Sequence, residues 1–285
     1  MNNKVWYITG ASKGLGLALV KKLLNNGYKV AATSRNLDEL KTAVGNSSTD
    51  FLPLVVNLTN EESVQQSIEN TLAHFGRIDV VVNNAGYGML GALEELTDAE
   101  ARANFEINVF GSLNVIRKVM PQLRKQQSGH IFNIASIGGF TGAFPGFGIY
   151  CATKFAVHGF TESLAAEAKP FGIHATVVSP GYFRTNFLND TSLSVPKNAM
   201  VEYANVRSVQ DAHQHSINAN QPGDPEKAAD VMIAVANHPN PPVQLFLGAD
   251  ACAAAAQKIE TVQKDMLEMQ SIATATGFKE SVGAA

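Results

Sequence analysis

The chain of 285 residues lacks several features that mark particular protein classes. It has only two cysteines, Cys151 and Cys252, which excludes a disulfide framework and a cysteine-based zinc site. A net charge of -3 offers no basic surface to nucleic acid or to an anionic membrane. No apolar run approaches the roughly 18 residues of a membrane span, and the first residues lack a signal-peptide pattern. We therefore expect a cytoplasmic globular protein without nucleic-acid or membrane partners.

Apolar runs typical of strands alternate with helical patterns along most of the chain. Such alternation predicts βαβ units and a parallel sheet covered on both faces. We expect an α/β fold with a single doubly wound, Rossmann-like domain over residues 1–250. The expected strands are 5–8, 29–33, 51–55, 78–82, 131–134, 173–178 and 243–247, and the expected helices are 15–25, 37–44, 61–75, 98–125, 150–169 and 225–237.

Three stretches depart from this rhythm. Residues 186–223 are polar and broken by Pro and Gly, which predicts a partly helical substrate-lid insertion. Residues 251–275 keep an amphipathic spacing, so we expect a C-terminal helix packed on the body or on a partner subunit, followed by a frayed tail at 276–285. Within the long helix, Pro121 predicts an end or a kink, and Asn108 predicts interrupted hydrogen bonding.

A glycine-rich turn follows the first expected strand and opens the first expected helix. Its sequence is Thr-Gly-Ala-Ser-Lys-Gly-Leu-Gly, from Thr9 to Gly16. In a doubly wound fold this position binds a pyrophosphate, because glycine allows close backbone approach and the helix N-terminus faces the phosphates. A tight strand-to-helix connection is the simpler alternative. The predicted cofactor-binding residues here are Gly10, Ser12, Lys13, Gly14, Leu15 and Gly16.

The ends of the later strands complete the predicted dinucleotide site. The second strand ends in Ser34 and Arg35, where an acidic residue would bind the ribose of NAD; a guanidinium there favours a 2′-phosphate and hence NADP(H), although it is also an ordinary surface charge. Several of the other positions are equally typical of turns. The further predicted cofactor-binding residues are Asn57, Leu58, Asn84, Ala85, Gly86, Pro180, Gly181, Phe183 and Thr185.

The chemical centre is predicted at Tyr150 and Lys154. Four residues apart on a helix, the phenol and the ammonium share one face, so we expect Lys154 to lower the pKa of Tyr150. Ser136 follows an apolar strand and is placed to hydrogen-bond the same substrate oxygen. Together the three residues would protonate a carbonyl oxygen.

These motifs together resemble the short-chain dehydrogenase/reductase family. The resemblance runs from about residue 5 to residue 185 and includes Asn83-Asn84-Ala-Gly86 and Pro180-Gly181. It implies that Tyr150 is the general acid/base, that Ser136 orients the carbonyl, that Lys154 binds the nicotinamide ribose, and that Asn108 supports a proton-relay water. Tyr150 and Lys154 are thereby also cofactor-binding residues. Asn57 departs from the Asp usual in the family.

The expected activity is NADPH-dependent carbonyl reduction, reversible as alcohol oxidation. Phe144, Phe147, Phe183 and Phe187 flank the site, which favours an apolar or aromatic small-molecule substrate, although core packing explains any one of them. The alternatives are an NADP(H)-binding sensor without turnover and a nucleotide-sugar epimerase or dehydratase. No metal site is expected, because His213 and His215 do not share a helix face. We expect a homodimer or homotetramer.

Overall fold

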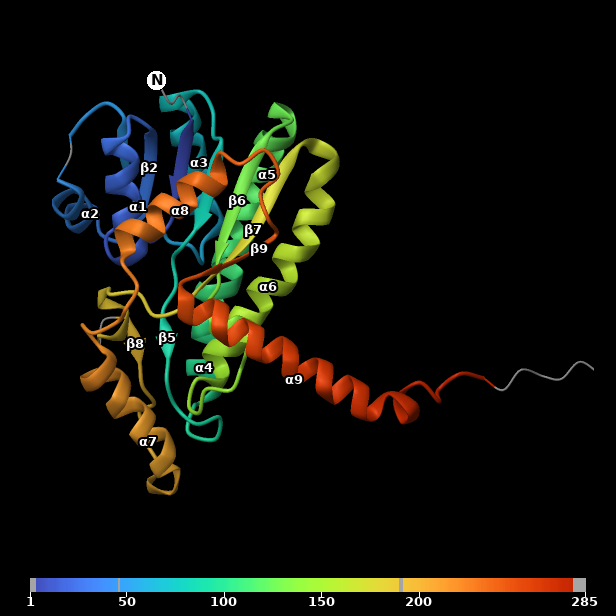
Figure 1. Ribbon diagram of the computed structural model, residues 1–285. Helices are drawn as coiled ribbons and strands as arrows, with labels where there is room; N and C mark the ends of the chain where they lie inside the picture. Colours follow the sequence, from blue (N-terminus) through green and yellow to red (C-terminus); the bar gives the residue numbers. More distant parts are fainter. Residues whose placement is uncertain (1–3, 46, 190–191, 279–285) are drawn as a thin grey trace, which may run out of the picture.

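A seven-stranded parallel sheet forms the centre of the molecule (Figure 1). The computed structural model describes residues 4–45, 47–189 and 192–278. The strand order is β3-β2-β1-β4-β6-β7-β9, the doubly wound order, in which β2 and β3 are added on one side of β1 and the later strands on the other. The strands are β1 (Val5–Ile8), β2 (Lys29–Ser34), β3 (Phe51–Val55), β4 (Val80–Asn83), β6 (Gly129–Ile134), β7 (Ile173–Pro180) and β9 (Gln244–Leu247). The predicted fold class and all seven predicted strands are confirmed.

Helices cover both faces of this sheet. One buried apolar cluster joins the sheet to α1, α2 and α8, and a second joins the opposite face to α3, α5 and α6. Local signals explain several helix starts: Asn36 and Asn60 accept hydrogen bonds from backbone N–H groups of the first turns of α2 and α3. The helices are α1 (Gly14–Asn25), α2 (Leu37–Val44), α3 (Glu61–Phe75), α5 (Gly111–Gln126), α6 (Gly148–Ala168) and α8 (Pro225–Ala236).

The long helix expected at 98–125 is divided into three parts. The structure has α4 (Asp98–Phe105), a π-helical turn at Glu106–Phe110, and then α5. Asn108 lies inside the π turn, as the predicted interruption requires. Of the two outcomes expected at Pro121, an end or a kink, the end does not occur, since α5 continues through Pro121 to Gln126.

The segment 186–223 is partly helical, as predicted, and lies below the main sheet in Figure 1. It contains β8 (Leu193–Ser194), α7 (Ala204–Asp211) and a π-helical turn at Ala212–Ile217. The β8 strand pairs in parallel with β5 (Gly88–Met89), a small sheet that the sequence did not predict. The buried Glu95 carboxylate binds this segment through the Met200 N–H at 2.8 Å and through Arg207 at 2.7 Å.

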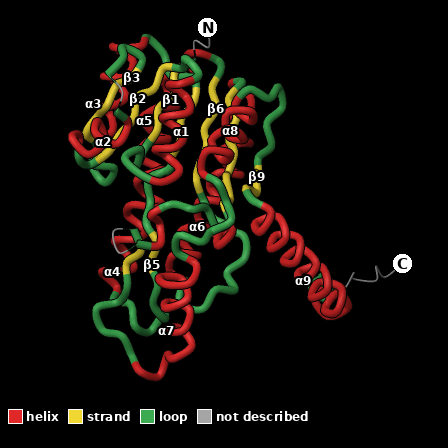
Figure 2. Tube along the Cα trace, turned by 60° about the vertical axis from the view of Figure 1, so that its left-hand side comes forward, coloured by secondary structure: helices red, strands yellow, loops and turns green. Residues whose placement is uncertain are grey.

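The last helix, α9 (Ala249–Ala273), points away from the body in both views (Figure 2). Only Ala251 and Ala255 are buried along it. Ile259 and Met266 are 54% and 68% exposed. The expectation that the helix packs along the body is therefore wrong for most of its length, and packing on a partner subunit stays a prediction. The expected tail at 276–285 lies mostly outside the described residues.

No helix in the described part of the chain has the length and apolar character needed to cross a membrane.

Candidate active site

The glycine-rich turn approaches β4 too closely for side chains. Gly10 has a φ of 64°, and a Cβ atom there would lie 2.7 Å from the Cα of Ala85. Gly14, at the first position of α1, has a φ of 60°. Both positions therefore require glycine, and the turn holds its backbone against the carboxyl end of β4.

Asn84 fixes this contact. Its side-chain amide donates to the carbonyl oxygens of Thr9 and Gly10 at 3.0 and 2.9 Å. A Cβ at Gly16 would lie 2.5 Å from the same amide nitrogen. Gly16 is buried and does not line the cleft described below; its lack of a side chain leaves room for the Asn84 amide and the Gly10 carbonyl oxygen. That Gly16 binds the cofactor stays a prediction.

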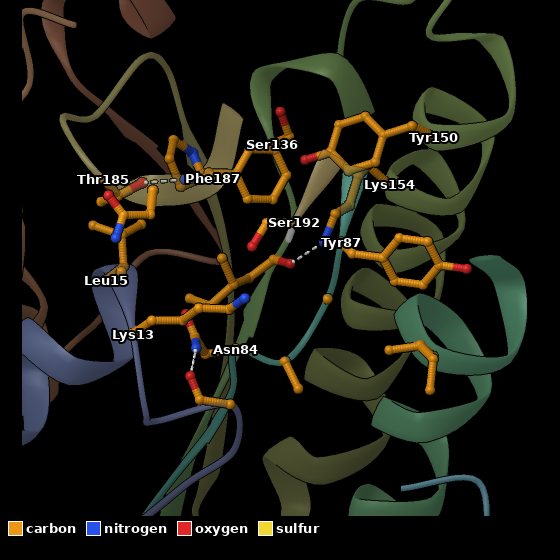
Figure 3. A pocket seen from close by; sticks show the side chains of 18 of the residues that line it. Lys13, Leu15, Asn84, Tyr87, Ser136, Tyr150, Lys154, Thr185, Phe187 and Ser192 are labelled. Carbon is orange, nitrogen blue, oxygen red and sulfur yellow. Dashed lines mark hydrogen bonds between the residues drawn. The ribbon is translucent and has the colours of Figure 1, made fainter. Parts of the chain in front are cut away.

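A cleft with a volume of about 840 Å³ runs across the carboxyl ends of the strands, from the glycine turn to the segment 186–223 (Figure 3). Apart from Gly16 and Asn108, the structure brings all the predicted catalytic, cofactor and substrate residues to this cleft. They are Gly10, Ser12, Lys13, Gly14, Leu15, Ser34, Arg35, Asn57, Leu58, Asn84, Ala85, Gly86, Ser136, Phe144, Phe147, Tyr150, Lys154, Pro180, Gly181, Phe183, Thr185 and Phe187.

One end of the cleft is bounded by the loops after β2 and β3. Arg35 is exposed there, and none of the described residues forms an ion pair with it. Glu39, on the first turn of α2, also lines the cleft, and the sequence analysis did not identify it. The Asn57 Oδ1 accepts hydrogen bonds from the N–H and hydroxyl of Thr59, so this side chain forms a turn.

Asn108 lies behind the cleft rather than in it. The side chain is 1% exposed; its Oδ1 accepts from the Tyr87 N–H, and its Nδ2 donates to the Tyr87 carbonyl and to the Thr153 hydroxyl. A Cβ at Gly86 would lie 3.0 Å from this Oδ1 and 3.5 Å from the Lys154 Nζ. Asn108 thus supports the wall behind Lys154 and does not face a substrate.

Ser136 and Tyr150 lie side by side and point into the cleft (Figure 3). Ser136 follows β6 and its hydroxyl accepts the Gly138 N–H at 3.1 Å, while Tyr150 lies on the first turn of α6. Burial raises the pKa of the Tyr150 phenol, and the Ser136 hydroxyl opposes this rise. The pKa shift is therefore opposite to the predicted lowering, because the ring is 8% exposed and desolvation outweighs any nearby cation.

Lys154 lies one helical turn beyond Tyr150 and is almost fully buried. Its ammonium donates to the Ile134 carbonyl oxygen at 2.9 Å and lies 5.7 Å from the Tyr150 ring centre. Burial lowers the pKa of Lys154 to about 8. At neutral pH the site therefore presents a protonated phenol and a cation, which suits proton donation to an oxygen.

The opposite part of the cleft is apolar. Phe144, Phe147 and Phe187 belong to the same apolar cluster as Tyr150, and the Phe187 ring lies 6.0 Å from the Tyr150 ring. Phe183 lines the cleft as well but packs against the main core. The polar side chains of Tyr182, His213 and Gln221 also line this end, and the sequence analysis did not predict them as cleft residues.

The residues fit a nicotinamide dinucleotide. The close glycine turn at the N-terminus of α1 leaves backbone N–H groups for a pyrophosphate, since Lys13 provides no side-chain cap there. The cleft continues from this turn to Ser136, Tyr150 and Lys154 at its other end. Within the described residues, no three His, Cys, Asp or Glu side chains gather as metal ligands.

The family model of the short chain dehydrogenases matches residues 4–195. This match covers more than half of the chain, so the protein belongs to the short-chain dehydrogenase family. It is 37% identical over 260 residues to oxidoreductase BOA17 of Botryotinia fuckeliana, covering 91% of this chain and 94% of that protein. It is 36% identical over 250 residues to a 3-ketodihydrosphingosine reductase of Bacteroides thetaiotaomicron, covering 87% and 89%.

Solved structures show the same fold. A short-chain dehydrogenase of Streptomyces avermitilis has a TM-score of 0.88 at 35% identity, covering 96% of this chain and 98% of that one. A 3-ketoacyl-(acyl-carrier-protein) reductase of Brucella melitensis with NADH has a TM-score of 0.72 at 25% identity, covering 86% and 96%. A Burkholderia cenocepacia short chain dehydrogenase with NADP has 0.72 at 26%, covering 94% and 99%. Similar structures therefore contain either cofactor.

Proposed function

We propose that this oxidoreductase is an NADPH-dependent carbonyl reductase, reversible as an alcohol dehydrogenase, for apolar or aromatic ketones, aldehydes and secondary alcohols. The observation that carries the proposal is the placement of Ser136 and Tyr150 between a dinucleotide-sized cleft and an apolar wall of phenylalanines. Similarity to a protein named 3-ketodihydrosphingosine reductase also favours the reduction of a ketone.

Each residue has a distinct task in this reaction. Bound NADPH supplies the hydride. The Ser136 hydroxyl and the Tyr150 phenol hold the carbonyl oxygen, and Tyr150 donates its proton to that oxygen as negative charge develops there. The Lys154 cation, next to the Tyr150 ring, stabilises the resulting tyrosinate. Asn108 joins the π turn to Tyr87 and to Thr153, the residue before Lys154, and, as the resemblance implies, supports a proton-relay water.

Arg35 is the basis of the preference for NADPH. It lines the cleft at the end of β2, and Lys13 in the glycine turn lines it as well. Both cations suit a 2′-phosphate, whereas NADH carries no charge there. Glu39 opposes them, so the size of the preference depends on the balance of these three side chains.

The cellular setting is also a proposal. The exposed apolar residues of α9 fit a contact with a second subunit, which favours a homodimer or homotetramer. Free Cys151 and Cys252 fit the reducing cytoplasm. Residues 1–250 would form the catalytic domain, with 186–223 as a lid over the substrate.

The test is a screen for NADPH oxidation with steroids, aromatic ketones, aliphatic aldehydes and β-keto esters, using wild type and Tyr150→Phe. The variant should lose about 10²- to 10⁴-fold in kcat, because it lacks the proton donor, and should keep its affinity for NADPH. Tyr203→Phe is the matched control, since the Tyr203 hydroxyl donates to the exposed Glu94. NADPH binding without oxidation of any substrate would favour the sensor alternative.

A further inference from the structure

Tyr182 is held firmly at the substrate end of the cleft. It follows β7, its N–H donates to the Asp250 carboxylate at 2.7 Å, and its carbonyl accepts from the Gly223 N–H at 2.9 Å. The Tyr182 backbone is thereby fixed between the start of α9 and the end of the segment 186–223. Burial raises the pKa of Tyr182, so the side chain is a protonated phenol at neutral pH.

The hydrogen bonds of His213 decide where the phenolic proton of Tyr182 points. The His213 Nδ1 lies 2.8 Å from the Val209 carbonyl oxygen, which can only accept, so Nδ1 carries the proton. In the neutral ring Nε2 is then an acceptor, and it lies 2.9 Å from the Tyr182 hydroxyl. Tyr182 therefore donates to His213, and its oxygen is left as a hydrogen-bond acceptor facing the cleft.

This pair is one aromatic ring away from the chemical centre. The Phe147 ring lies 6.1 Å from the Tyr150 ring on one side and 5.0 Å from the His213 ring on the other. The Phe147 ring thus presents an apolar surface between the Tyr150 ring and the Tyr182–His213 pair. The cleft is polar at both ends of its substrate region and apolar between them.

Gln221 adds an independent sign of a polar ligand at this end. It lines the same cleft, is 2% exposed, and precedes by two residues the Gly223 that binds Tyr182. Within the described part of the chain, neither its amide nitrogen nor its amide oxygen has a hydrogen-bond partner. A buried amide without partners is costly unless a ligand group satisfies it.

We propose that Tyr182, positioned by His213 and assisted by Gln221, forms a second polar subsite that accepts a hydrogen bond from a hydroxyl group at the far end of the substrate. The preferred substrate is then a hydroxylated apolar ketone, with the hydroxyl and the reacting carbonyl separated by an aromatic or alicyclic stretch. Tyr182 and Gln221 bind the hydroxyl, and His213 is a positioning residue, because it acts through the orientation of the Tyr182 proton.

The inference rests on the proposed reductase, and its test separates the two. We would measure kcat/KM with methyl ketones that carry a phenyl group on spacers of several lengths, each with hydrogen, hydroxyl or methoxy in the para position. At the best spacer, wild type should favour hydroxyl over hydrogen and over methoxy by roughly three- to tenfold, the effect of one neutral hydrogen bond. Failure to reduce any ketone would overturn the reductase itself.

Variants identify the groups responsible. Gln221→Leu should reduce the preference for hydroxyl over hydrogen. His213→Leu frees the Tyr182 proton, so the phenol can donate to a methoxy oxygen and the discrimination between hydroxyl and methoxy should disappear. His213→Gln, whose amide oxygen can accept the Tyr182 proton, should restore it. Tyr182→Phe should bring the hydroxyl and hydrogen substrates close to equality only when it is combined with both His213→Leu and Gln221→Leu, because otherwise the free Nε2 of His213 or the Gln221 amide oxygen accepts in its place.

The controls are His215→Leu, two residues further along the same π turn and exposed, and Tyr203→Phe in the same segment. Both should leave the three-substrate pattern unchanged. Equal rates for all three substrates in wild type would overturn the inference and leave the reductase standing. The inference would also be overturned if His213→Leu lowered kcat/KM for all three substrates by one common factor, because His213 would then have only a structural role.

Discussion

The Lys154 ammonium lies over the Tyr150 ring, 5.7 Å from its centre, and both side chains are more than nine-tenths buried. Burial acts in opposite directions on the two groups. It raises the pKa of the phenol and lowers the pKa of the lysine to about 8, because in each case the neutral form is favoured. The pair therefore holds the proton on Tyr150 firmly and the proton on Lys154 loosely.

The first prediction concerns the pH dependence of carbonyl reduction. The Lys154 cation is present below a pH of about 8 and is lost above it, while Tyr150 keeps its proton throughout. We expect kcat/KM for a ketone to be level between about pH 6 and 7.5 and to fall above pH 8, by about tenfold per unit. Steady-state rates at saturating NADPH would check this. A level profile up to about pH 10 would show that the charge on Lys154 does not matter.

The second prediction is that Lys154→Met inactivates the enzyme but stabilises the fold at neutral pH. The pKa of Lys154 in the folded protein lies below the ordinary lysine value of 10.5, so the unfolded chain binds more protons between about pH 8 and 10.5. The buried charge lowers the free energy of unfolding of wild type most below pH 8, by roughly 3 kcal/mol, and this destabilisation declines as the pH rises to 10.5. The variant also loses the hydrogen bond from Lys154 to the Ile134 carbonyl oxygen, and this loss reduces the gain in stability.

Thermal unfolding of Lys154→Met and wild type at pH 7 and pH 9.5 measures this. The variant should unfold at a higher temperature at pH 7, with a smaller difference at pH 9.5. Lys118→Met, at a partly exposed lysine that pairs with the exposed Glu61, is the matched control and should show no such gain. A Lys154→Met variant less stable than wild type at pH 7 would mean that the hydrogen bond outweighs the desolvation.

Much of the site was predictable because a parallel sheet places its chemistry where strands end. Three parts of the site each follow an apolar strand: the turn with Gly10 and Gly14, Ser136, and Thr185. The strand pattern alone therefore predicted that they line one cleft. The spacing of Tyr150 and Lys154 gave a shared helix face. The spacing did not show that this face is buried, and for this reason the predicted direction of the Tyr150 pKa shift was wrong.

The contacts that were not predicted join distant segments without any sequence motif. The Tyr182 hydroxyl meets His213 across 31 residues, and only the folding of the segment 186–223 brings them together. The β5–β8 sheet has two residues on each strand, which is too few to show the alternation of apolar and polar residues that predicts a strand. The spacing of apolar residues predicted α9 as a helix, but its direction depends on packing that no local pattern encodes.

The third prediction concerns cofactor choice. Arg35→Ala should raise KM for NADPH roughly 10- to 150-fold and change NADH little, the effect of one charged hydrogen bond. Ser34→Asp should shift preference toward NADH by repelling the phosphate and accepting from the ribose. Glu39→Gln should act in the opposite sense and lower KM for NADPH severalfold, because it removes a repulsive carboxylate from the cleft.

These variants are compared by kcat/KM with both cofactors. Lys41→Ala, an exposed cation on α2 that does not line the cleft, is the control. Unchanged NADPH kinetics in Arg35→Ala, or a wild-type enzyme that prefers NADH, would contradict the NADPH assignment without affecting the reductase.

The fourth prediction concerns the segment 186–223 as a lid. It is joined to the body at β5–β8, at Glu95, and through the apolar cluster that contains Phe147 and Tyr150. We expect its backbone amides to gain protection from hydrogen exchange when NADPH and an unreactive substrate analogue bind together. Equal protection of residues 204–217 with and without these ligands would make the segment a static part of the fold.

We expect the ion pair between Glu95 and Arg207 to determine how firmly the segment 186–223 is attached to the body. Burial raises the pKa of Glu95, but the N–H groups of Met200 and Ala92, together with Arg207, hold it below its usual value, so the carboxylate is charged.

Arg207→Met leaves that buried charge without its cation and should loosen the lid. We expect faster exchange over 204–217 and a severalfold higher KM for the ketone, with KM for NADPH nearly unchanged. Arg102→Met removes an exposed ion pair with Asp98 and should change neither quantity. If Arg207→Met matched this control, the Glu95 contact would have no part in substrate closure.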